Sequence, residues 1–344
     1  MTEVIAAPRT ASQVLAWSRE RIDPALRAAV DTLPAAARDL AGYHFGWWDE
    51  HGRAADGSGG KAIRPALTLL AAEAVGGGTA EALVAATAVE LVHNHSLVHD
   101  DVMDGDTTRR HRPTVWRVFG VNPAIQAGDA LLALAFGVLA DCGRPAAVRG
   151  VRLLGIATQA VVDGQLADLE LETADHVEMA ECVRMATAKT GSLMACACAV
   201  GAVFGGGRAE QVEHLSAFGE GVGLAFQHVD DLLGIWGDPA VTGKPSHADL
   251  RRRKKSLPVV AALTSGTAAG RELAALYLGR EQLSDVDVRR AAHLIDAAGG
   301  RAWSRHQVDM LLTGALDHLR AARLHPTTAE ELTALASLAS HRDH

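Results

Sequence analysis

The segment GTAEALVAATAVELVHNHSLVHDDVMD (residues 78–104) sets the fold class of this chain. Its apolar residues recur at three- and four-residue spacing, which is the repeat of a buried α-helix. The segment ends in a dense group of aspartates, Asp100, Asp101 and Asp104. A second segment, VGLAFQHVDDLLGIWGD (222–238), has the same character and carries an acidic pair. The two segments predict long helices that pass from an apolar body to an acidic end.

The composition agrees with an all-α fold. The chain has 344 residues, of which 48% are apolar and only 4% aromatic. Alanine and leucine dominate, and both favour helix. Between Pro123 and Pro239 only Pro145 interrupts, which leaves room for long helices. No composition break or low-complexity linker appears, so we expect one domain over residues 1–344. Its Ala-rich first 35 residues are expected to pack loosely, and residues 326–344 to form a terminal helix.

Charge and cysteine content exclude several classes of function. Lys and Arg number 33 against 41 Asp and Glu, a formal charge of -8 that disfavours nucleic acid or anionic membrane as a partner. The four cysteines fit neither a zinc site nor a disulfide framework. Cys196 and Cys198 lie in a small-residue apolar run and are expected to be buried thiols. We see no signal peptide or membrane span, so a cytoplasmic protein is expected.

The first acidic group indicates a divalent cation. Asp100 and Asp104 are four residues apart and share a helix face, where like charges destabilise a helix unless a cation lies between them. Mg²⁺ prefers oxygen ligands and is usually shared with substrate phosphates. Arg109 and Arg110 follow directly, and guanidinium groups suit phosphate oxygens. A solvated acidic helix end is the alternative, but the preceding segment is typical of a protein core.

The second acidic group repeats this order of features. Asp230 and Asp231 follow an apolar helical run, and Lys244 and a basic block from Arg251 to Lys255 come after them. Two such helices facing each other would hold several cations around one diphosphate. Metals and cations stabilise the charge that leaves with a diphosphate, which makes cleavage of a carbon–oxygen bond feasible.

With these motifs the chain resembles the trans-isoprenyl diphosphate synthases, the polyprenyl synthetase family, and is closest in character to its geranylgeranyl and farnesyl diphosphate synthases. The resemblance covers about residues 57 to 260. The motifs that carry it, in the family's order, are GGKAIRP (59–65), DDVMDGDTTRRHRPT (100–114), GQLAD (164–168), KT (189–190), FQHVDD (226–231), GDPAVTGK (237–244) and KKSLP (254–258). It implies an all-α bundle of long helices around a central cavity, and a homodimer.

The resemblance also implies a magnesium site and two diphosphate sites. Mg²⁺, three ions with diphosphate bound, would be held by Asp100, Asp104 and Asp230, with Asp101 and Asp231 close by. The allylic diphosphate would be gripped by Arg109, Lys189 and Lys244. The diphosphate of isopentenyl diphosphate would be held by Lys61, Arg64, His93 and Arg110.

Further residues would serve the carbocation. Loss of diphosphate leaves an allyl cation, the isopentenyl double bond attacks it, and a proton leaves with the departing diphosphate. Thr190, Gln227 and the Lys189 carbonyl region would face that cation. Gln165 and Asp168 would support the site, and Lys254 would close over it. The apolar helices beside the acids would exclude water, which would quench the cation.

Product length is expected to depend on the helix before Asp100. In the family the growing tail passes residues one to three turns before the first motif, here Ser96, His95, Val92 and Val89. Bulky aromatics at the first two would stop the chain at farnesyl. Because Ser96 is small and His95 is of medium size, geranylgeranyl diphosphate is the expected product.

The chain departs from the family pattern at Gly234, where the second motif usually has its third aspartate, and at His111, where glycine is common. Asp238 could replace the missing acid through water. Gly234 leaves a non-catalytic partner subunit as one alternative, and a terpene cyclase is another. Zinc at His95 and His99, one helical turn apart, is a weaker alternative. A P-loop is excluded, because GGK at 59–61 lacks the motif's remaining residues.

Overall fold

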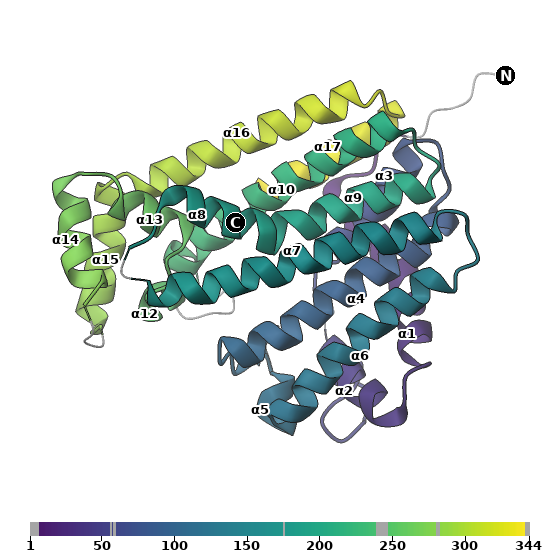
Figure 1. Ribbon diagram of the computed structural model, residues 1–344, viewed down its shortest axis with the longest axis horizontal. Coiled ribbons are helices and arrows are strands. Elements are labelled where there is room, and N and C mark those ends of the chain that lie inside the picture. The colour runs from purple at the N-terminus through teal and green to yellow at the C-terminus, as the bar shows by residue number, and fades with distance from the viewer. Residues whose placement is uncertain are drawn as a thin grey trace. The chain divides into compact units, whose positions relative to one another are not determined.

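The structure is a computed structural model that describes residues 7–55, 57, 60–174, 176–238, 247–279 and 283–340. Within these ranges the fold is all-α, as predicted, with one two-stranded hairpin. Figure 1 labels the α-helices of the chain. In chain order the elements are α1 (Ala11–Val30), α2 (Ala35–Phe45), α3 (Ile63–Ala74), α4 (Thr79–Met103), β1 (Thr108–Arg109), β2 (Arg112–Pro113), α5 (Val115–Phe119), α6 (Val121–Ala140), α7 (Ala147–Thr173), α8 (Met179–Ala186), η1 (Thr187–Gly191), α9 (Ser192–Phe204), α10 (Ala209–Trp236), α12 (Ala248–Arg251), α13 (Leu257–Leu263), α14 (Ala268–Tyr277), α15 (Asp285–Ala297), α16 (Gly300–Ala321) and α17 (Pro326–Ser340).

The chain forms two compact units that are each discontinuous in sequence. The first comprises residues 1–158, 193–219 and 319–335. The second comprises residues 159–192, 220–318 and 336–344. The first acidic motif and the GGK segment belong to the first unit, and the second acidic motif with the basic block belongs to the second. Each unit is described separately below, and the single domain expected from the sequence stays a prediction.

Helix α4 is the central helix of the first unit and matches the predicted segment 78–104 within a residue at each end. It packs against α3 on one side and α6 on the other, and α1 lies against it as well. Its buried residues are spread around the helix rather than confined to one stripe, as expected of a helix covered on most faces. The polar residues that it does bury, described below, therefore need partners inside the protein.

Helix α1 is packed firmly, contrary to the expectation of a loose N-terminal segment. Val14, Ile22 and Val30 are fully buried. With Ser18 and Leu26 they form one stripe at four-residue spacing, which places them on a single helix face. The alanine content of the segment hid this stripe. A capping box at Thr10 and ion pairs from Arg9 to Glu73 and Glu331 fix the start of the helix.

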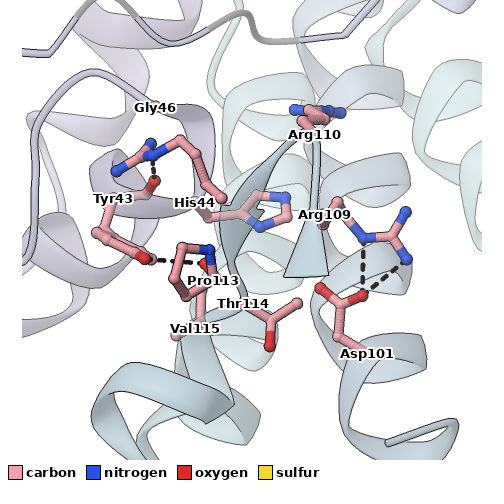
Figure 2. A pocket seen from close by; sticks show the side chains of 10 residues that line it. Tyr43, His44, Gly46, Asp101, Arg109, Arg110, Pro113, Thr114 and Val115 are labelled. Carbon is pink, nitrogen blue, oxygen red and sulfur yellow. Dashed lines mark hydrogen bonds and ion pairs between the residues drawn. The ribbon is translucent and has the colours of Figure 1, made fainter. Parts of the chain in front are cut away.

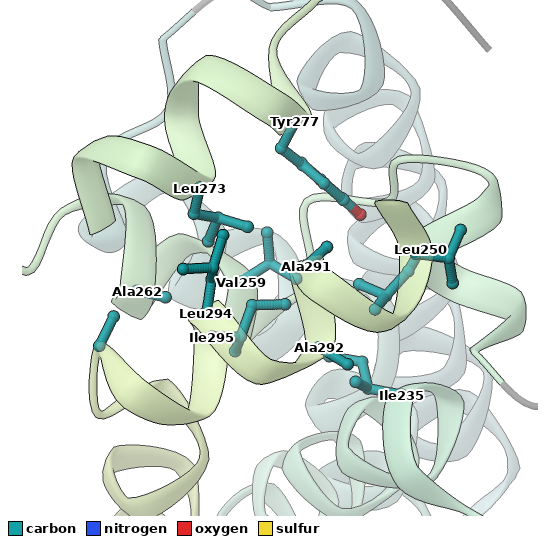
Figure 3. Close-up of a cluster of buried hydrophobic side chains, with 12 residues drawn as sticks. Ile235, Leu250, Val259, Ala262, Leu273, Tyr277, Ala291, Ala292, Leu294 and Ile295 are labelled. Carbon is teal, nitrogen blue, oxygen red and sulfur yellow. The ribbon is translucent and has the colours of Figure 1, made fainter. Parts of the chain in front are cut away.

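The second unit contains a compact apolar cluster beside its basic segment (Figure 3). Ile235, Leu250, Val259 and Leu273 are fully buried in it, with Tyr277 at its edge. The Tyr277 hydroxyl donates to the carbonyl of Lys254 at 2.9 Å, and Arg253 donates to the carbonyl of Tyr277 at 2.5 Å. The cluster therefore fixes the backbone that carries Lys254.

Within the part of the chain that the structure describes, two helical stretches are long and apolar enough to cross a membrane by length and composition alone. They are Val121–Ala140 and the continuous stretch Met179–Phe204, of which 33% and 72% respectively is buried within the protein. The expectation that no stretch approaches a span was therefore too strict. The second stretch includes α9, whose Cys196 and Cys198 are buried free thiols as predicted, so it is a core helix.

The crossing of α3 and α9 in the first unit requires a glycine. A Cβ atom at Gly201 would overlap the carbonyl oxygen of Thr68, which is backbone and cannot rotate away. Gly201→Ala should therefore lower the free energy of unfolding by about 2 kcal/mol, the cost of overpacking a core. Gly137→Ala in α6 is the matched control, because open space surrounds Gly137 and alanine favours helix. Urea unfolding of both variants checks this, and equal stabilities would contradict it.

Candidate active site

The acidic end of α4 is electrostatically unfavourable in the free chain. The helix ends at Met103 with Asp104 as its C-cap, so Asp100 and Asp104 lie where the helix dipole is negative. Both side chains are half-buried, so solvent still reaches them. Two carboxylates on one face at a helix C-terminus repel each other and the dipole, and a bound cation would offset both penalties.

Asp101 differs from its neighbours because it faces the protein. Only 2% of it is exposed, and its Oδ1 accepts hydrogen bonds at 2.7 Å from Nε and Nη2 of Arg109. Burial raises the pKa of Asp101 to about 6, although Arg109 acts to lower it. Asp101 therefore orients Arg109, and direct metal ligation by Asp101 stays a prediction.

The paired arginines lie on the tight β1–β2 hairpin. Thr108 pairs with Pro113 and Arg109 with Arg112, which leaves Arg110 and His111 as a two-residue loop. Both have positive φ, 51° and 61°, as the turn types favoured in such hairpins require. Glycine would adopt this conformation without strain, which explains why His111 is an unusual residue here. The turn directs Arg109 and Arg110 to different neighbours.

The GGK segment lies against Arg110. Gly60 has φ +84°, and a Cβ there would stand 2.8 Å from Nη2 of Arg110. Glycine is thus needed both for the backbone conformation and for the close approach. Lys61 follows with an exposed side chain, while Gly59 lies outside the described residues. The structure brings the GGK segment and the second arginine together, as the assignment to one diphosphate requires.

Arg64 adds a second cation to this group, and the neutral His93 lies beside it. Nη1 of Arg64 lies 3.3 Å from Nε2 of His93. Burial and the nearby Arg64 and Arg110 lower the pKa of His93 well below its usual value. The ring is therefore neutral and accepts a hydrogen bond from Arg64, which leaves the other imidazole nitrogen, Nδ1, to donate.

A buried polar chain, which the sequence analysis missed, lies beneath the hairpin. His44 lies 3.0 Å from Oδ1 of Asn94, and Asn94 donates to Glu90 Oε1 at 3.1 Å. His44 and Asp101 also line a small pocket with Arg109 and Arg110 (Figure 2). A glutamate inside an otherwise apolar helical stretch, AVELV, was the sequence signal that could have revealed this chain.

The residues expected to control product length are arranged along α4. Val92 and Val89 are buried, and Ser96 is half-buried with its hydroxyl donating to the His93 carbonyl. Nδ1 of His95 lies 3.0 Å from the Gly128 carbonyl of α6, and Nε2 of His99 lies 3.0 Å from the Ile125 carbonyl. Each histidine thus uses one ring nitrogen to bind α6, which does not favour the zinc alternative.

In the second unit, Lys189 lies in the π-helical turn η1, a feature common at functional sites. Its Nζ is 2.6 Å from Oδ2 of Asp168. Burial opposes ionisation of Asp168, but Lys254 and Lys189 together hold its pKa below the usual value. A Cβ at Gly164 would overlap the Lys189 backbone nitrogen, so the glycine of GQLAD lets α7 approach this turn. Gln165 is buried, and neither its oxygen nor its nitrogen has a hydrogen-bond partner among the described residues.

A hydrogen-bonded chain links the next predicted residues. Thr190 donates to Gln227 at 2.6 Å, and Gln227 donates to Oδ1 of Asp231 at 2.8 Å. Oδ2 of Asp231 accepts from the Leu257 backbone amide at 2.9 Å. Burial raises the pKa of Asp231 to about 7, partly offset by Lys254. Asp231 therefore organises the site from within, whereas Asp230 is half-buried and reachable by solvent.

The structure modifies the view of Gly234. A Cβ there would overlap the carboxylate of Asp249, from the short helix α12. The volume left by the missing aspartate is thus filled by another acidic side chain, which sequence spacing could not reveal. Asp238 is exposed at the end of the described segment, and Lys244 lies outside the described residues.

The carboxylates of the acidic motifs suit an ion such as Mg²⁺, which keeps water and phosphate among its ligands, better than an ion surrounded by protein ligands alone. Among the described residues, no three His, Cys, Asp or Glu side chains are close enough to hold a metal ion together. Mg²⁺ is typically bound by one or two carboxylates, with water and substrate phosphate completing its shell. In the first unit Asp100 and Asp104, and in the second unit Asp230, have carboxylates that solvent reaches, as ligands of such an ion would.

Comparison with known proteins identifies the family. Residues 47–295 match the family described as Polyprenyl synthetase. The chain belongs to the polyprenyl synthetase family. Its acidic motifs, GGK segment and basic block all lie within the matched range.

Members of the polyprenyl synthetase family with different names resemble the chain almost equally. A (2E,6E)-farnesyl diphosphate synthase of Mycobacterium tuberculosis is 45% identical over 94% of this chain and 91% of its own. A geranylgeranyl diphosphate synthase of the same organism is 44% identical over 96% and 93%. The crystal structure of a polyprenyl synthetase from Streptomyces coelicolor A3(2) has a TM-score of 0.91 at 46% identity, covering 95% of this chain and 98% of that one. These relatives establish the enzyme class and leave the product open.

The buried His44 predicts a specific acid sensitivity. Burial, and then the nearby Arg110 and Arg109, lower its pKa to about 3. Between about pH 6.5, the ordinary pKa of histidine, and about pH 3, His44 is protonated in the unfolded chain and neutral in the folded one. The free energy of unfolding therefore falls as the pH falls through this range. His44→Gln keeps an amide donor for Asn94 and should flatten this dependence by up to about 1.4 kcal/mol per pH unit. Urea unfolding at about pH 7 and about pH 5 measures it. An unchanged slope would show that His44 is protonated in the fold.

Proposed function

We propose that the chain is a trans-prenyltransferase that condenses isopentenyl diphosphate with an allylic diphosphate to give a longer linear diphosphate. Membership of the polyprenyl synthetase family, whose matched members are isoprenyl diphosphate synthases, supports the enzyme class. The observation that carries the proposal is the arrangement of the first unit. Reachable carboxylates end α4, and Arg64 and Arg110, which both act on the charge of Glu90, form a separate cationic group beside that helix.

The residues of this chain would divide the work as follows. Arg109, oriented by Asp101, and Lys189, held by Asp168, would bind the allylic diphosphate. Lys61, Arg64, His93 and Arg110 would hold the second diphosphate, and Lys244 and Lys254 would add cations from the second unit. The hydroxyl of Thr190 and the carboxamide of Gln227 are already fixed by hydrogen bonds, so they need no reorganisation to stabilise a nearby cation.

Mg²⁺ would be held by Asp100, Asp104 and Asp230, with Asp101 and Asp231 as supporting carboxylates. When bound, it would neutralise the charge that develops on the departing diphosphate. The proposal includes three Mg²⁺ ions in the site when diphosphate is bound. We also propose a cytoplasmic homodimer, because the family resemblance implies a dimer.

Geranylgeranyl diphosphate is the proposed product. Ser96 leaves more room on α4 than an aromatic residue would, and the His95 ring is bound to α6 by its Nδ1 atom. Relatives named for farnesyl, geranylgeranyl and geranylfarnesyl products all resemble the chain, so this part rests on the side chains of α4. Incubation with isopentenyl diphosphate and each allylic primer, followed by chromatography of the dephosphorylated products, tests both the reaction and its product.

Metal dependence gives a first direct test. Excess chelator should abolish turnover, and Mg²⁺ should restore it. Asp100→Ala and Asp104→Ala should each lower kcat by about 100-fold or more, because a cation that has lost one of its ligands no longer lies where charge develops on the leaving diphosphate. Asp141→Ala, an exposed acid at the end of α6, is the control. Circular dichroism should show unchanged helix content. Near-normal activity in either α4 variant would mean that the cluster is only a surface feature.

Product length gives a second test. Ser96→Phe should shorten the main product by at least one isoprene unit, because the ring would fill the space beside α4 that the tail needs. Ser96→Ala keeps that space open and should leave the product unchanged. Chromatography of dephosphorylated products reads out both variants. An unchanged product from Ser96→Phe would show that the tail runs elsewhere.

A further inference from the structure

A buried glutamate lies among three arginines in the first unit. Glu90 of α4 is only 3% exposed. Burial raises its pKa, while Arg64, Arg110 and Arg19, in that order of charge effect, act to lower it. These cations come from three separate elements: α3, the β1–β2 hairpin and α1. One carboxyl group thus has charged neighbours from three parts of the chain that are far apart in sequence.

A hydrogen bond fixes one oxygen of the Glu90 carboxyl group, and the other oxygen accepts none from the described residues. Oε1 accepts from Nδ2 of Asn94, which is itself oriented by His44. Oε2 is buried and has no hydrogen-bond partner among the described residues. Nη1 of Arg110 and Nη2 of Arg19 are likewise buried without hydrogen-bond partners there. Such atoms are costly unless charge attraction or trapped water offsets their desolvation.

Arg110 in particular needs a counter-charge. It lies in a loop of positive φ, its guanidinium is pressed against Gly60, and burial lowers its pKa while Glu90 acts to raise it. Arg109 and Arg19 repel it. Of the two carboxylates that act on Arg110, Glu90 has the larger charge effect and Asp101 the smaller, so Glu90 is the main counter-charge to the repulsion from Arg109 and Arg19.

We infer that Glu90 is a positioning residue for the diphosphate of isopentenyl diphosphate, holding Arg64 and Arg110 in the spacing that this diphosphate needs. The inference rests on the proposed function, which assigns that diphosphate to Arg64 and Arg110. Glu90 touches no substrate itself. Its support comes from Asn94 and His44, so the buried polar chain sets the geometry of the cationic group.

Kinetics of Glu90→Gln tests the inference. Glutamine keeps the acceptor for Asn94 but turns a neutral amide donor toward the guanidinium groups. KM for isopentenyl diphosphate should rise about tenfold, which corresponds to about 1.4 kcal/mol. KM for the allylic primer should stay within about twofold. Glu331→Gln is the matched control, since Glu331 is also 3% exposed and pairs with an arginine, Arg9, away from the site. It should lower stability without a selective change in KM.

A binding measurement separates this inference from the proposed function. Calorimetric titration of isopentenyl diphosphate in excess chelator needs no turnover, and the proposed ligands of its diphosphate are side-chain cations. Glu90→Gln should weaken binding about tenfold and Glu331→Gln should not. If the wild-type chain condenses both substrates and Glu90→Gln binds isopentenyl diphosphate as tightly as the wild type, the inference is wrong and the proposed function stands. A wild-type chain that condenses nothing would overturn the proposed function.

Two further variants keep the inference testable if Glu90→Gln does not fold. Glu90→Asp retains the charge on a shorter side chain and should raise KM for isopentenyl diphosphate about threefold, again selectively. An unchanged KM, or an equal rise for both substrates, would contradict a positioning role. In an Arg110→Gln background, Glu90→Gln should raise KM for isopentenyl diphosphate by a smaller factor than in the wild type, because Glu90 acts on this KM partly through Arg110. Full additivity would contradict it.

Discussion

A carboxyl group that is removed from water needs hydrogen bonds or positive charge close by, and α4 carries two such groups, Glu90 and Asp101. Glu90 is surrounded by arginines from three elements, and Asp101 binds Arg109 directly. Asp101 therefore holds Arg109 in place before any substrate arrives, and the inferred role of Glu90 is the same for Arg64 and Arg110 through their charges. The half-buried Asp100 and Asp104 have a different environment, because solvent reaches them and the helix terminus disfavours them. One helix therefore separates acids that orient arginines from acids that a cation in solution can reach.

The second unit applies the same division to a different motif. Asp231 accepts hydrogen bonds from Gln227 and from the Leu257 amide, so it is committed to the protein. Asp168 is committed to Lys189. Asp230 keeps access to solvent. In both acidic pairs the first aspartate faces outward and the second inward, as expected for adjacent residues on a helix that is buried on one side.

The sequence allowed the helices and the acidic motifs to be predicted because both depend on local spacing. Helix α4 follows from its apolar repeat, and the shared face of Asp100 and Asp104 follows from their separation by four residues. The buried chain of His44, Asn94 and Glu90 could not be predicted, because His44 is 50 residues from Asn94 in sequence. The packing of α1 was also missed, since its stripe of buried residues is diluted by alanine. The spacing of apolar residues predicts individual helices, whereas contacts between side chains of different helices can be seen only once the chain is folded.

The overlap between Gly234 and Asp249 has an evolutionary consequence. A side chain at position 234 and a carboxylate at position 249 compete for the same volume, so neither position can be read alone. In relatives that carry an aspartate at 234, the side chain at 249 must rotate away, be smaller or lie on a shifted segment. The two positions should therefore co-vary across descendants of a common ancestor, even though a stretch of 14 intervening residues separates them. A comparison of sequences alone would count Gly234 as a lost carboxylate, whereas in the structure the carboxylate of Asp249 occupies that volume.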